Sequence, residues 1–320
     1  MFQYMNYVCE VYKTGSSSKA AKNLYLTQPA LSIAIKKEEQ ELGQPLFERS
    51  TSHIALTEAG KAYIESAEKI KNIETSLRLY CNDLSELKTG SVRVGASNFF
   101  LSQIVLSVIS EFSRKYPGID LEIREAPSLE LKEKIRKEEL DIIIDPMIQE
   151  DSMFQSHVLF EEHFLLAVPE KIAAGSGAEA YALSRSQILD GFHLLPGCPK
   201  VPLFLFADKP FILLRPETVT YGHAMEICES YGFTPKVRFF LDQLITSYHF
   251  VGKGLGIAFV SDCLVKLTPP EPGVLFFQLD SPLAKREVAA VHKKNRYLSS
   301  ASAAFIETAK KMIENHQIFT

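Results

Sequence analysis

Apolar residues recur at helical spacing through most of residues 2–88, and this pattern predicts an all-α start to the chain. The first expected helix carries its apolar residues at Phe2, Met5, Val8, Cys9 and Tyr12. Thr14 and Gly15 are expected to end it. Only the segment near residues 49–56 is rich in turn-forming residues.

Two further short helices follow. Ser17 or Ser18 is expected to cap the second helix, because a serine hydroxyl can accept a hydrogen bond from a free first-turn amide. Thr27 is expected to cap the third, whose first turn tolerates Pro29 because amides there have no partner within the helix. Three short helices with a tight turn between the last two predict a helix-turn-helix, whose last helix lies in the DNA major groove.

The outward side of the third helix carries residue types that suit DNA. Gln28 can make paired hydrogen bonds to adenine, Ser32 can contact bases or phosphate, and Lys36 can neutralise a phosphate. We expect Ile33 to pack on a thymine methyl group. An amphipathic helix with a solvated face is the alternative that periodicity alone leaves open.

After residues 88–90 the pattern changes to short β-rich runs separated by segments with helical periodicity. We expect strands at 91–97, 118–124, 139–145, 163–169, 210–214, 235–241, 254–260, 274–280 and 286–292, and a closing helix at 298–315. Alternating strands and helices are typical of βαβ units and a parallel sheet. The sequence therefore predicts an α/β remainder.

Polar residues follow the first three of these strands. Ser97 and Asn98 come after the first, Ser128 after the second and Pro146 after the third. Ligands of parallel sheets bind at this edge, where hydroxyl groups and free helix amides can hold a carboxylate. A purely structural role of Ser97 and Ser128 as helix caps is at least as well supported by the sequence alone.

Composition and charge narrow the function only slightly. The 320 residues are 46% hydrophobic and 23% charged, with a formal net charge of −4, so overall charge gives no indication of nucleic acid binding. Residues 1–61 hold seven basic and six acidic side chains. We therefore expect modest electrostatic attraction to DNA, with affinity that depends on dimerisation.

We expect no enzyme activity, metal, cofactor or membrane insertion. The five cysteines lie far apart without C-x-x-C spacing, which suggests free thiols in a reducing compartment. Neither G-x-S-x-G nor H-E-x-x-H occurs, and the histidines are scattered. No leader-like segment or long apolar run is present, which predicts a cytoplasmic protein.

The run from Ser16 to Gly60 contains several spaced motifs, which read TQPALS (27–32), LG (42–43), LFER (46–49) and LTEAG (56–60). With them the run resembles the N-terminal winged helix-turn-helix of LysR-type transcriptional regulators. In that family the third helix reads the major groove, and the hairpin after LFER is a wing beside the DNA backbone. The candidate DNA-binding residues are Ser17, Ser18, Thr27, Gln28, Pro29, Ser32, Ile33, Lys36, Arg49 and His53.

This run departs from the family pattern in three places. Glu38 stands where a leucine is usual on the inward face, which predicts that the third helix ends or bends early. Ile33 replaces a basic or polar residue. The wing, usually rich in arginine, reads STSH at residues 50–53.

A heptad seam marks the helix expected from about residue 57 to residue 88. Its a and d positions are Ile70, Ile73, Leu77, Tyr80, Leu84 and Leu87. The helix resembles the family's linker helix, which pairs subunits, although such a seam can also pack on its own domain. Pairing would place two winged domains on a pseudo-palindromic site in double-stranded DNA.

The remainder resembles, through looser motifs, the family's effector-binding region. That region is folded like the periplasmic solute-binding proteins, with a cleft between two Rossmann-like α/β subdomains. The resemblance implies a DNA-binding domain at 1–60, a linker helix at 61–89, and an effector-binding domain at 90–320 with subdomain I at 90–162 and 266–320 and subdomain II at 163–265.

Candidate effector-binding residues come from both walls of this cleft. One wall supplies Ser97, Asn98, Phe99, Ser128 and Pro146, and the other supplies Thr218, Thr220 and Tyr221, with Thr246 and His249 as weaker candidates. The expected effector is a small molecule, for which an anion is one option.

The predicted function is a DNA-binding transcriptional regulator whose promoter binding responds to a small-molecule effector in the cleft. The protein is expected to act as a homodimer or homotetramer. The alternative is a cytoplasmic solute-binding sensor without sequence-specific DNA binding.

Overall fold

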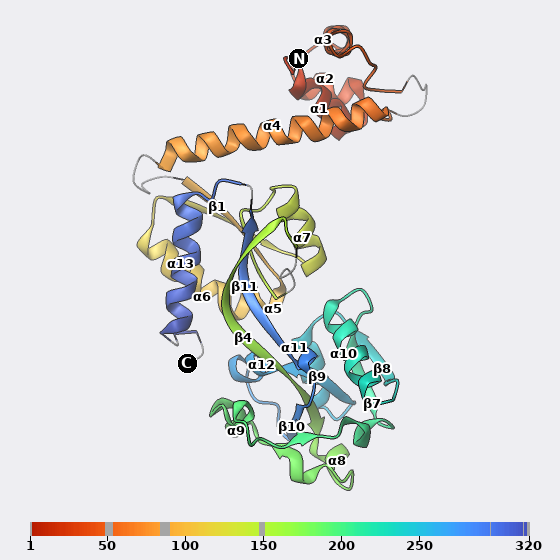
Figure 1. The fold of residues 1–320 in the computed structure, drawn as a ribbon, viewed down its shortest axis with the longest axis vertical. Coiled ribbons are helices and arrows are strands. Elements are labelled where there is room, and N and C mark those ends of the chain that lie inside the picture. The colour runs from red at the N-terminus through yellow and green to blue at the C-terminus, as the bar shows by residue number, and fades with distance from the viewer. Residues whose placement is uncertain are drawn as a thin grey trace. The chain divides into compact units, whose positions relative to one another are not determined.

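The fold comes from a computed structural model that describes residues 2–48, 54–83, 90–146, 151–294, 296–315 and 317–318. The chain divides into two compact units, Met1–Cys81 and Asn82–Thr320 (Figure 1). Among the helices in the described ranges, none combines the length and apolarity that a membrane span requires.

The described part of the smaller unit consists of helices α1 (Met5–Thr14), α2 (Ser17–Asn23), α3 (Gln28–Leu42) and α4 (Glu58–Asp83). Thr27 caps α3 as predicted, because its Oγ1 accepts a hydrogen bond from the Ala30 N–H at 3.4 Å. The predicted cap of α2 is wrong by one residue. Ser16 Oγ accepts from the Lys19 N–H at 3.4 Å, and in a run of three serines the sequence cannot say which hydroxyl faces the free amide.

One apolar cluster holds these helices together. Its buried members are Met5, Val8, Val11, Ala20, Ala21, Leu31, Ile35, Leu46, Tyr63, Ile64 and Ala67. The start of α4 joins the cluster at Gly60, where a Cβ atom would lie 2.0 Å from the Leu46 carbonyl oxygen. Glycine at this position therefore permits the close approach of α4 to residue 46.

Glu38 belongs to the inward face of α3 and is 1% exposed. Its carboxylate accepts hydrogen bonds from the backbone N–H groups of Phe2 and Tyr4, the latter at 3.0 Å. Burial by itself raises the pKa of Glu38, but these bonds outweigh burial and lower it. The prediction that α3 ends or bends at Glu38 is wrong, because the amides before α1 satisfy the charge and the helix extends to Leu42.

The chain between α3 and α4 begins as an antiparallel pair. Phe47 bridges to Leu56, and the Glu48 N–H donates to the Ala55 carbonyl at 2.9 Å. This pairing agrees with a wing. The candidates Arg49 and His53 lie outside the described residues.

The larger unit contains strands and helices in alternation. Its strands are β1 (Gly90–Ala96), β2 (Ile119–Glu125), β3 (Ile142–Asp145), β4 (Phe154–Pro169), β5 (Ala182–Leu183), β6 (Lys200–Val201), β7 (Pro210–Leu214), β8 (Lys236–Leu241), β9 (Ile257–Ser261), β10 (Val274–Leu279) and β11 (Lys285–Lys293). Its α-helices are α5 (Asn98–Phe100), α6 (Leu106–Lys115), α7 (Ser128–Arg136), α8 (Glu170–Ala173), α9 (Arg185–Leu189), α10 (Val219–Ser230), α11 (Leu244–Gly252), α12 (Asp262–Leu267) and α13 (Ser300–Glu314). A π-helical turn, η1 (Leu101–Val105), joins α5 to α6, and short 3-10 turns are η2 (Glu179–Tyr181), η3 (Phe192–Leu194), η4 (Leu203–Phe206) and η5 (Pro282–Ala284).

The strands form two sheet regions that share β4. Subdomain I is built on the order β2-β1-β3-β11-β4, in which β1 pairs in parallel with β2 and β3. Subdomain II is built on the order β4-β9-β7-β8, in which β7 pairs in parallel with β8 and β9. Figure 1 shows β4 and β11 side by side as they pass from one subdomain toward the other. The predicted fold of two Rossmann-like subdomains is confirmed.

The strand pairing moves one predicted boundary. β10 pairs with β4 at residues 165–169 and with β5 and β6, so it belongs to subdomain II. We therefore place the return of the chain to subdomain I at Lys285, where β11 begins, instead of at residue 266. The apolar run of β10 predicts a strand correctly, but nothing in it identifies β4 as the neighbour.

Candidate DNA-binding surface and effector site

The N-terminal half of α3 presents an open polar surface. Gln28, Pro29, Ser32 and Lys36 are exposed, and Ile33 is 57% exposed. An isoleucine that is more than half exposed on the side opposite the core contributes little to the packing of its own domain. Its contact to a thymine methyl group stays a prediction.

α2 supports this surface from beside α3. The exposed Ser18 Oγ donates to Gln28 Oε1 at 3.1 Å and so restricts the glutamine side chain. Ser17 is half-buried at the start of α2. The Thr27 hydroxyl caps α3, so its main role here is structural.

The predicted seam of α4 is exposed along its described part. Ile73, Leu77 and Tyr80 are 68%, 62% and 51% exposed, whereas Ile70 packs partly against the helix-turn-helix core. Leu84 and Leu87 lie outside the described residues. Consecutive exposed apolar side chains along one helix face indicate a contact surface for another chain.

A cavity of about 430 Å³ lies between the two subdomains of the larger unit. Its walls are the C-terminal strand ends and the helices that follow them. The lining residues are Ser97, Asn98, Phe99, Phe100, Glu125, Ala126, Pro127, Ser128, Leu129, Pro146, Leu214, Arg215, Glu217, Thr218, Val219, Thr220, Asp242, Gln243, Leu244 and Arg286. Most of the predicted effector-binding residues are thus brought together.

Helix N-termini dominate this lining. α5 and α7 reach the cavity from subdomain I, and α10 and α11 reach it from subdomain II. First-turn amides have no partner within their helix, and the helix dipole places partial positive charge at this end. The cavity is therefore suited to a negatively charged group.

The hydroxyl groups around the cavity differ in their bonding. The Ser97 side chain makes no capping hydrogen bond. Ser128 Oγ donates to Oδ2 of the buried Asp145, at the end of β3, at 2.6 Å. Thr218 Oγ1 donates to the Arg215 carbonyl at 2.8 Å and accepts from the Tyr221 N–H at 3.2 Å. The hydroxyl groups of the two serines therefore have more hydrogen-bonding capacity left for a ligand than that of Thr218.

Arg286 on β11 is a candidate that the sequence pattern did not reveal. Its side chain is 11% exposed, and its Nε donates to the fully buried Glu162 of β4. Its Nη1 lies 3.4 Å from Thr220 Oγ1, and its guanidinium lies 4.6 Å from the centre of the Phe164 ring. A cation just before the apolar run at residues 288–291 was the available signal.

The other charged side chains of the lining are exposed, and three of them, Glu125, Arg215 and Asp242, have hydrogen-bond partners. Arg215 Nε donates to Asp242 Oδ1 at 2.6 Å, and Asn98 Nδ2 donates to Glu125 Oε1 at 3.0 Å. On α10, burial and then the charge of Arg286 lower the pKa of His223, which favours its neutral form at pH 7. The semi-buried positive charge of this lining is therefore that of Arg286.

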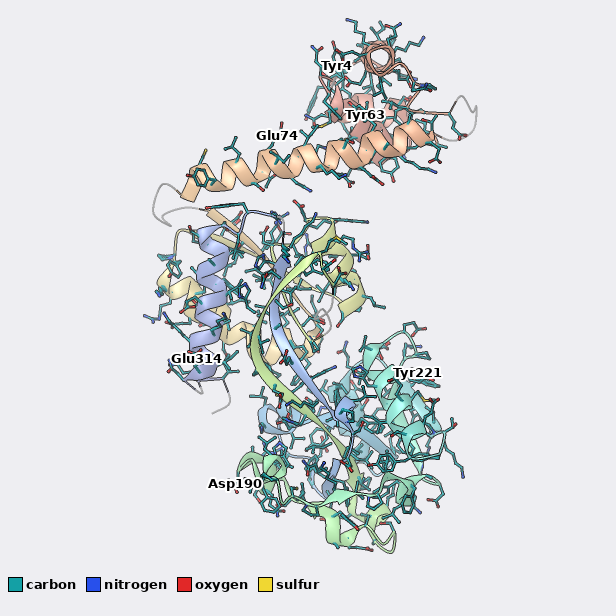
Figure 2. All side chains as sticks on the ribbon, viewed as in Figure 1. Tyr4, Tyr63, Glu74, Asp190, Tyr221 and Glu314 are labelled. Atoms are coloured by element: carbon teal, nitrogen blue, oxygen red, sulfur yellow. The ribbon has the colours of Figure 1, made fainter. Side chains whose placement is uncertain are left out.

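Three predicted effector-binding residues lie outside the cavity lining. Tyr221, labelled on α10 in Figure 2, turns its ring toward Phe240, with the ring centroids 6.2 Å apart. Thr246 and His249 lie beyond the first residues of α11, and His249 Nδ1 is 2.5 Å from Glu271 Oε1. The cavity meets α11 only at its N-terminal end, and Tyr221 is absent from the lining although it lies in the first turn of α10, so the geometry does not support these three predictions. Within the described ranges, no group of three or more potential ligands could hold a metal ion.

Comparisons with known proteins agree with this architecture. Residues 2–61 match the family described as bacterial regulatory helix-turn-helix protein, lysR family, and residues 85–313 match the LysR substrate binding domain. The chain belongs to the LysR family and is a DNA-binding transcriptional regulator with an effector-binding domain. The helix-turn-helix match favours this function over a solute-binding sensor without DNA binding.

Individual relatives span nearly the whole chain. The uncharacterized HTH-type transcriptional regulator YcgK of Bacillus subtilis is 28% identical over 310 residues, which cover 97% of this chain and 94% of the relative. Full-length OxyR from Pseudomonas aeruginosa shares the fold with a TM-score of 0.64 at 23% identity, covering 100% of this chain and 96% of that one. CbnR complexed with its target DNA gives a TM-score of 0.59 at 17% identity, covering 97% and 99% of the two chains.

Proposed function

We propose that this regulator binds a pseudo-palindromic promoter site through α3 and responds to a small anionic effector held in the cleft by Arg286 and the surrounding helix N-termini. It acts in the cytoplasm as a homodimer or homotetramer paired through α4. It carries out no catalysis. The observation that carries the proposal is the cavity itself, where helix N-termini from both subdomains meet a guanidinium group.

The size and lining of the cavity suit a small metabolite. A volume of about 430 Å³ falls at the lower end of the range of small-molecule sites. Phe99, Phe100 and Leu244 provide apolar surface, and Ser97 provides a hydroxyl group without a capping partner. The proposed effector therefore combines an anionic group near Arg286 with a small apolar part.

The arrangement of the strands supports a coupling between effector and DNA. The cavity is lined from both subdomains, and β4 and β11 pass between them. A ligand that contacts both walls stabilises the closed cleft and shifts the population toward it. In a dimer, a change of cleft closure alters the spacing of the paired DNA-binding domains, which is a coupling between two distinct sites.

The cleft assignment can be tested with a panel of simple anions. We would measure the thermal midpoint of the wild-type chain with monocarboxylates, dicarboxylates, inorganic phosphate and sulfate, and with neutral analogues. We expect at least one anion to raise the midpoint, and Arg286→Gln to abolish that rise. Arg114→Gln is the matched control, because Arg114 is exposed, bonded to Glu111 and outside the cavity lining. A rise that persists in Arg286→Gln would contradict the assignment.

The DNA and dimer assignments have separate tests. Gln28→Ala combined with Ser32→Ala should reduce binding of a selected duplex to the level of an unrelated duplex, because base contacts carry the specificity. Light scattering should still show the dimer for this variant. Leu77→Glu should instead yield monomers, because the side chain is exposed along the proposed seam.

A further inference from the structure

The turn between α2 and α3 contains a tyrosine in an unfavourable backbone conformation. Tyr25 has φ 55°, in the left-handed region that favours glycine and asparagine. Among the described residues, only Phe2 and Glu138 share a positive φ without being glycine. The Tyr25 N–H donates to the Lys22 carbonyl at 3.2 Å, and so the turn holds Tyr25 in this conformation.

Packing within the chain does not offset this conformational cost. Tyr25 is 96% exposed, more than any other large apolar or aromatic side chain in the described ranges. Its ring and hydroxyl contact no described residue through a hydrogen bond or ring interaction. A large aromatic side chain with strained backbone and no internal partner indicates that its benefit comes from outside the chain.

The position of Tyr25 identifies the nature of that outside partner. Tyr25 lies two residues before Thr27, the N-cap of α3, in the turn that joins α2, which carries Ser18, to α3, which carries Gln28. A helix that enters the major groove with its N-terminus places the preceding turn beside a sugar-phosphate strand. A tyrosine hydroxyl is a donor that commonly contacts phosphate oxygens.

We propose that Tyr25 is a positioning residue that donates its phenolic hydrogen to a DNA phosphate at the edge of the groove occupied by α3. The inference rests on the proposed insertion of α3 into the major groove. Because a phosphate contact is independent of sequence, Tyr25 fixes the orientation of α3 on the duplex and leaves base reading to Gln28 and Ser32. Because the phenol is neutral, it contributes no counterion release.

Two substitutions separate the hydroxyl group from the backbone conformation. Tyr25→Phe keeps the ring and removes the donor, and it should weaken DNA binding about 5- to 10-fold. Tyr25→Gly removes the side chain and accepts positive φ. It should weaken binding at least as much while the thermal midpoint of the helix-turn-helix unit stays equal or rises by about 2 °C. Tyr12→Phe is the matched control, because Tyr12 is 52% exposed on α1, outside the helix-turn-helix pair.

The experiment measures fluorescence anisotropy of the full chain with two duplexes of equal length. One duplex is selected from a random library by the wild-type protein, and the other is unrelated. We expect equal fold losses on both duplexes and an unchanged salt slope. Unchanged binding by Tyr25→Phe, or a loss confined to the selected duplex, overturns the inference. If Tyr25→Phe and the control Tyr12→Phe lose the same affinity, the effect is not specific to Tyr25 and the inference also fails.

The failure of the underlying function has a different signature. If the wild-type protein recovers no sequence from the library, the proposed role of α3 is overturned together with this inference. If the wild-type protein selects a sequence and Gln28→Ala weakens binding to that duplex only, the proposed role of α3 is supported. The results for Tyr25→Phe and Tyr25→Gly then decide the role of Tyr25 separately.

Discussion

The two subdomains of the effector-binding unit follow one topology but contribute differently to the cleft. In each, a first strand lies between the second and third parallel strands, giving β2-β1-β3 in subdomain I and β8-β7-β9 in subdomain II. In subdomain I the Ser97 hydroxyl makes no capping bond, whereas in subdomain II the Thr218 hydroxyl is bonded on both sides. Shared topology thus places helix N-termini at the same edge, and local bonding decides which groups remain for a ligand.

The buried carboxylates of the two subdomains also differ in their partners. In subdomain I, Asp141 pairs with Arg93 at 2.8 Å and with Arg296 at 2.7 Å. In subdomain II, Asp262 is 1% exposed and pairs with His193 at 3.1 Å and with Lys266 at 2.7 Å. The carboxylate of Asp141 is thus paired with two arginines, whereas that of Asp262 is paired with a histidine and a lysine.

The largest effect is expected from Arg286→Ala, which removes the cation that β11 places against β4. Glu162 would remain fully buried as an unpaired carboxylate, and its Oε2 already has no hydrogen-bond partner. Breaking a buried pair on one side costs about 3–5 kcal/mol, which corresponds to a fall in thermal midpoint of roughly 6–20 °C for a unit of this size. Differential scanning calorimetry measures this fall.

A double substitution provides the control for this effect. Arg286→Met with Glu162→Gln removes both charges and should recover most of the lost stability, since a buried pair replaced by uncharged groups is often close to neutral. Recovery of stability without recovery of the anion response would separate the structural role of the pair from its role in the cleft. A single Arg286→Ala variant as stable as the wild type would contradict the ion pair.

The second largest effect concerns stability in acid, which should depend on the charge of the Asp262 carboxylate. Burial by itself raises the pKa of Asp262, but His193, Lys266 and the His163 N–H outweigh it and hold the pKa well below its usual range. An unfolded aspartate has a pKa near 3.9. Because the folded-state pKa is lower than the unfolded one, the stabilisation is present above about pH 4 and is lost as pH falls through the folded-state pKa.

Asp262→Asn should therefore lose about 2–4 kcal/mol at pH 7, and this loss relative to the wild type should shrink steadily as the pH falls below about 4. Urea unfolding at pH 7, 5, 3 and 2 would measure the difference. Asp141→Asn is the matched variant in subdomain I, where burial likewise raises the pKa and bonds from Arg93 and the charge of Arg296 lower it. If the free energies of unfolding of Asp262→Asn and the wild type differ by the same amount at every pH, the charge of the Asp262 carboxylate is not the origin of the stabilisation.

The third effect tests the contrast between the hydroxyl groups of the two walls. Thr218→Ala removes a cap with two hydrogen bonds and should cost about 1 kcal/mol, or about 2–4 °C. Ser97→Ala removes no capping bond and should change the thermal midpoint by less than about 2 °C. If the effector binds through Ser97, this variant should instead weaken the anion response. Equal destabilisation by both variants would remove the proposed difference between the walls.

The sequence predicts those parts of the site that follow from local pattern. Ser97, Ser128 and Thr218 each follow a β-rich run and precede a helical one, and in parallel βαβ units such positions necessarily converge. The same argument explains why His249 is not in the lining, because a converging helix presents its first turn and His249 lies later in α11. Tyr221 lies in the first turn of α10, but its ring packs toward Phe240.

Arg286 could not be predicted in this way, because its environment depends on long-range strand pairing. Its partner Glu162 lies 124 residues away on β4, and the register between the strands includes an irregularity at Val288/Ala289. Glu38 shows the same limit at shorter range. Its position in the pattern is read correctly as inward, but the amides of Phe2 and Tyr4 that satisfy it become visible only in the folded domain.

The smallest effect is expected from His249→Ala, which tests whether α11 contributes only its first turn to the cleft. The His249 side chain is 49% exposed, and its contact to Glu271 lies near the surface and contributes less than about 1 kcal/mol. The variant should therefore keep both the thermal midpoint and the anion response of the wild type. Gln243→Ala, at the N-cap of α11 and in the cavity lining, is the matched change and should weaken the response. If His249→Ala weakens the response and Gln243→Ala does not, the ligand lies farther along α11, and the cleft has to extend over the face that carries Thr246 and His249.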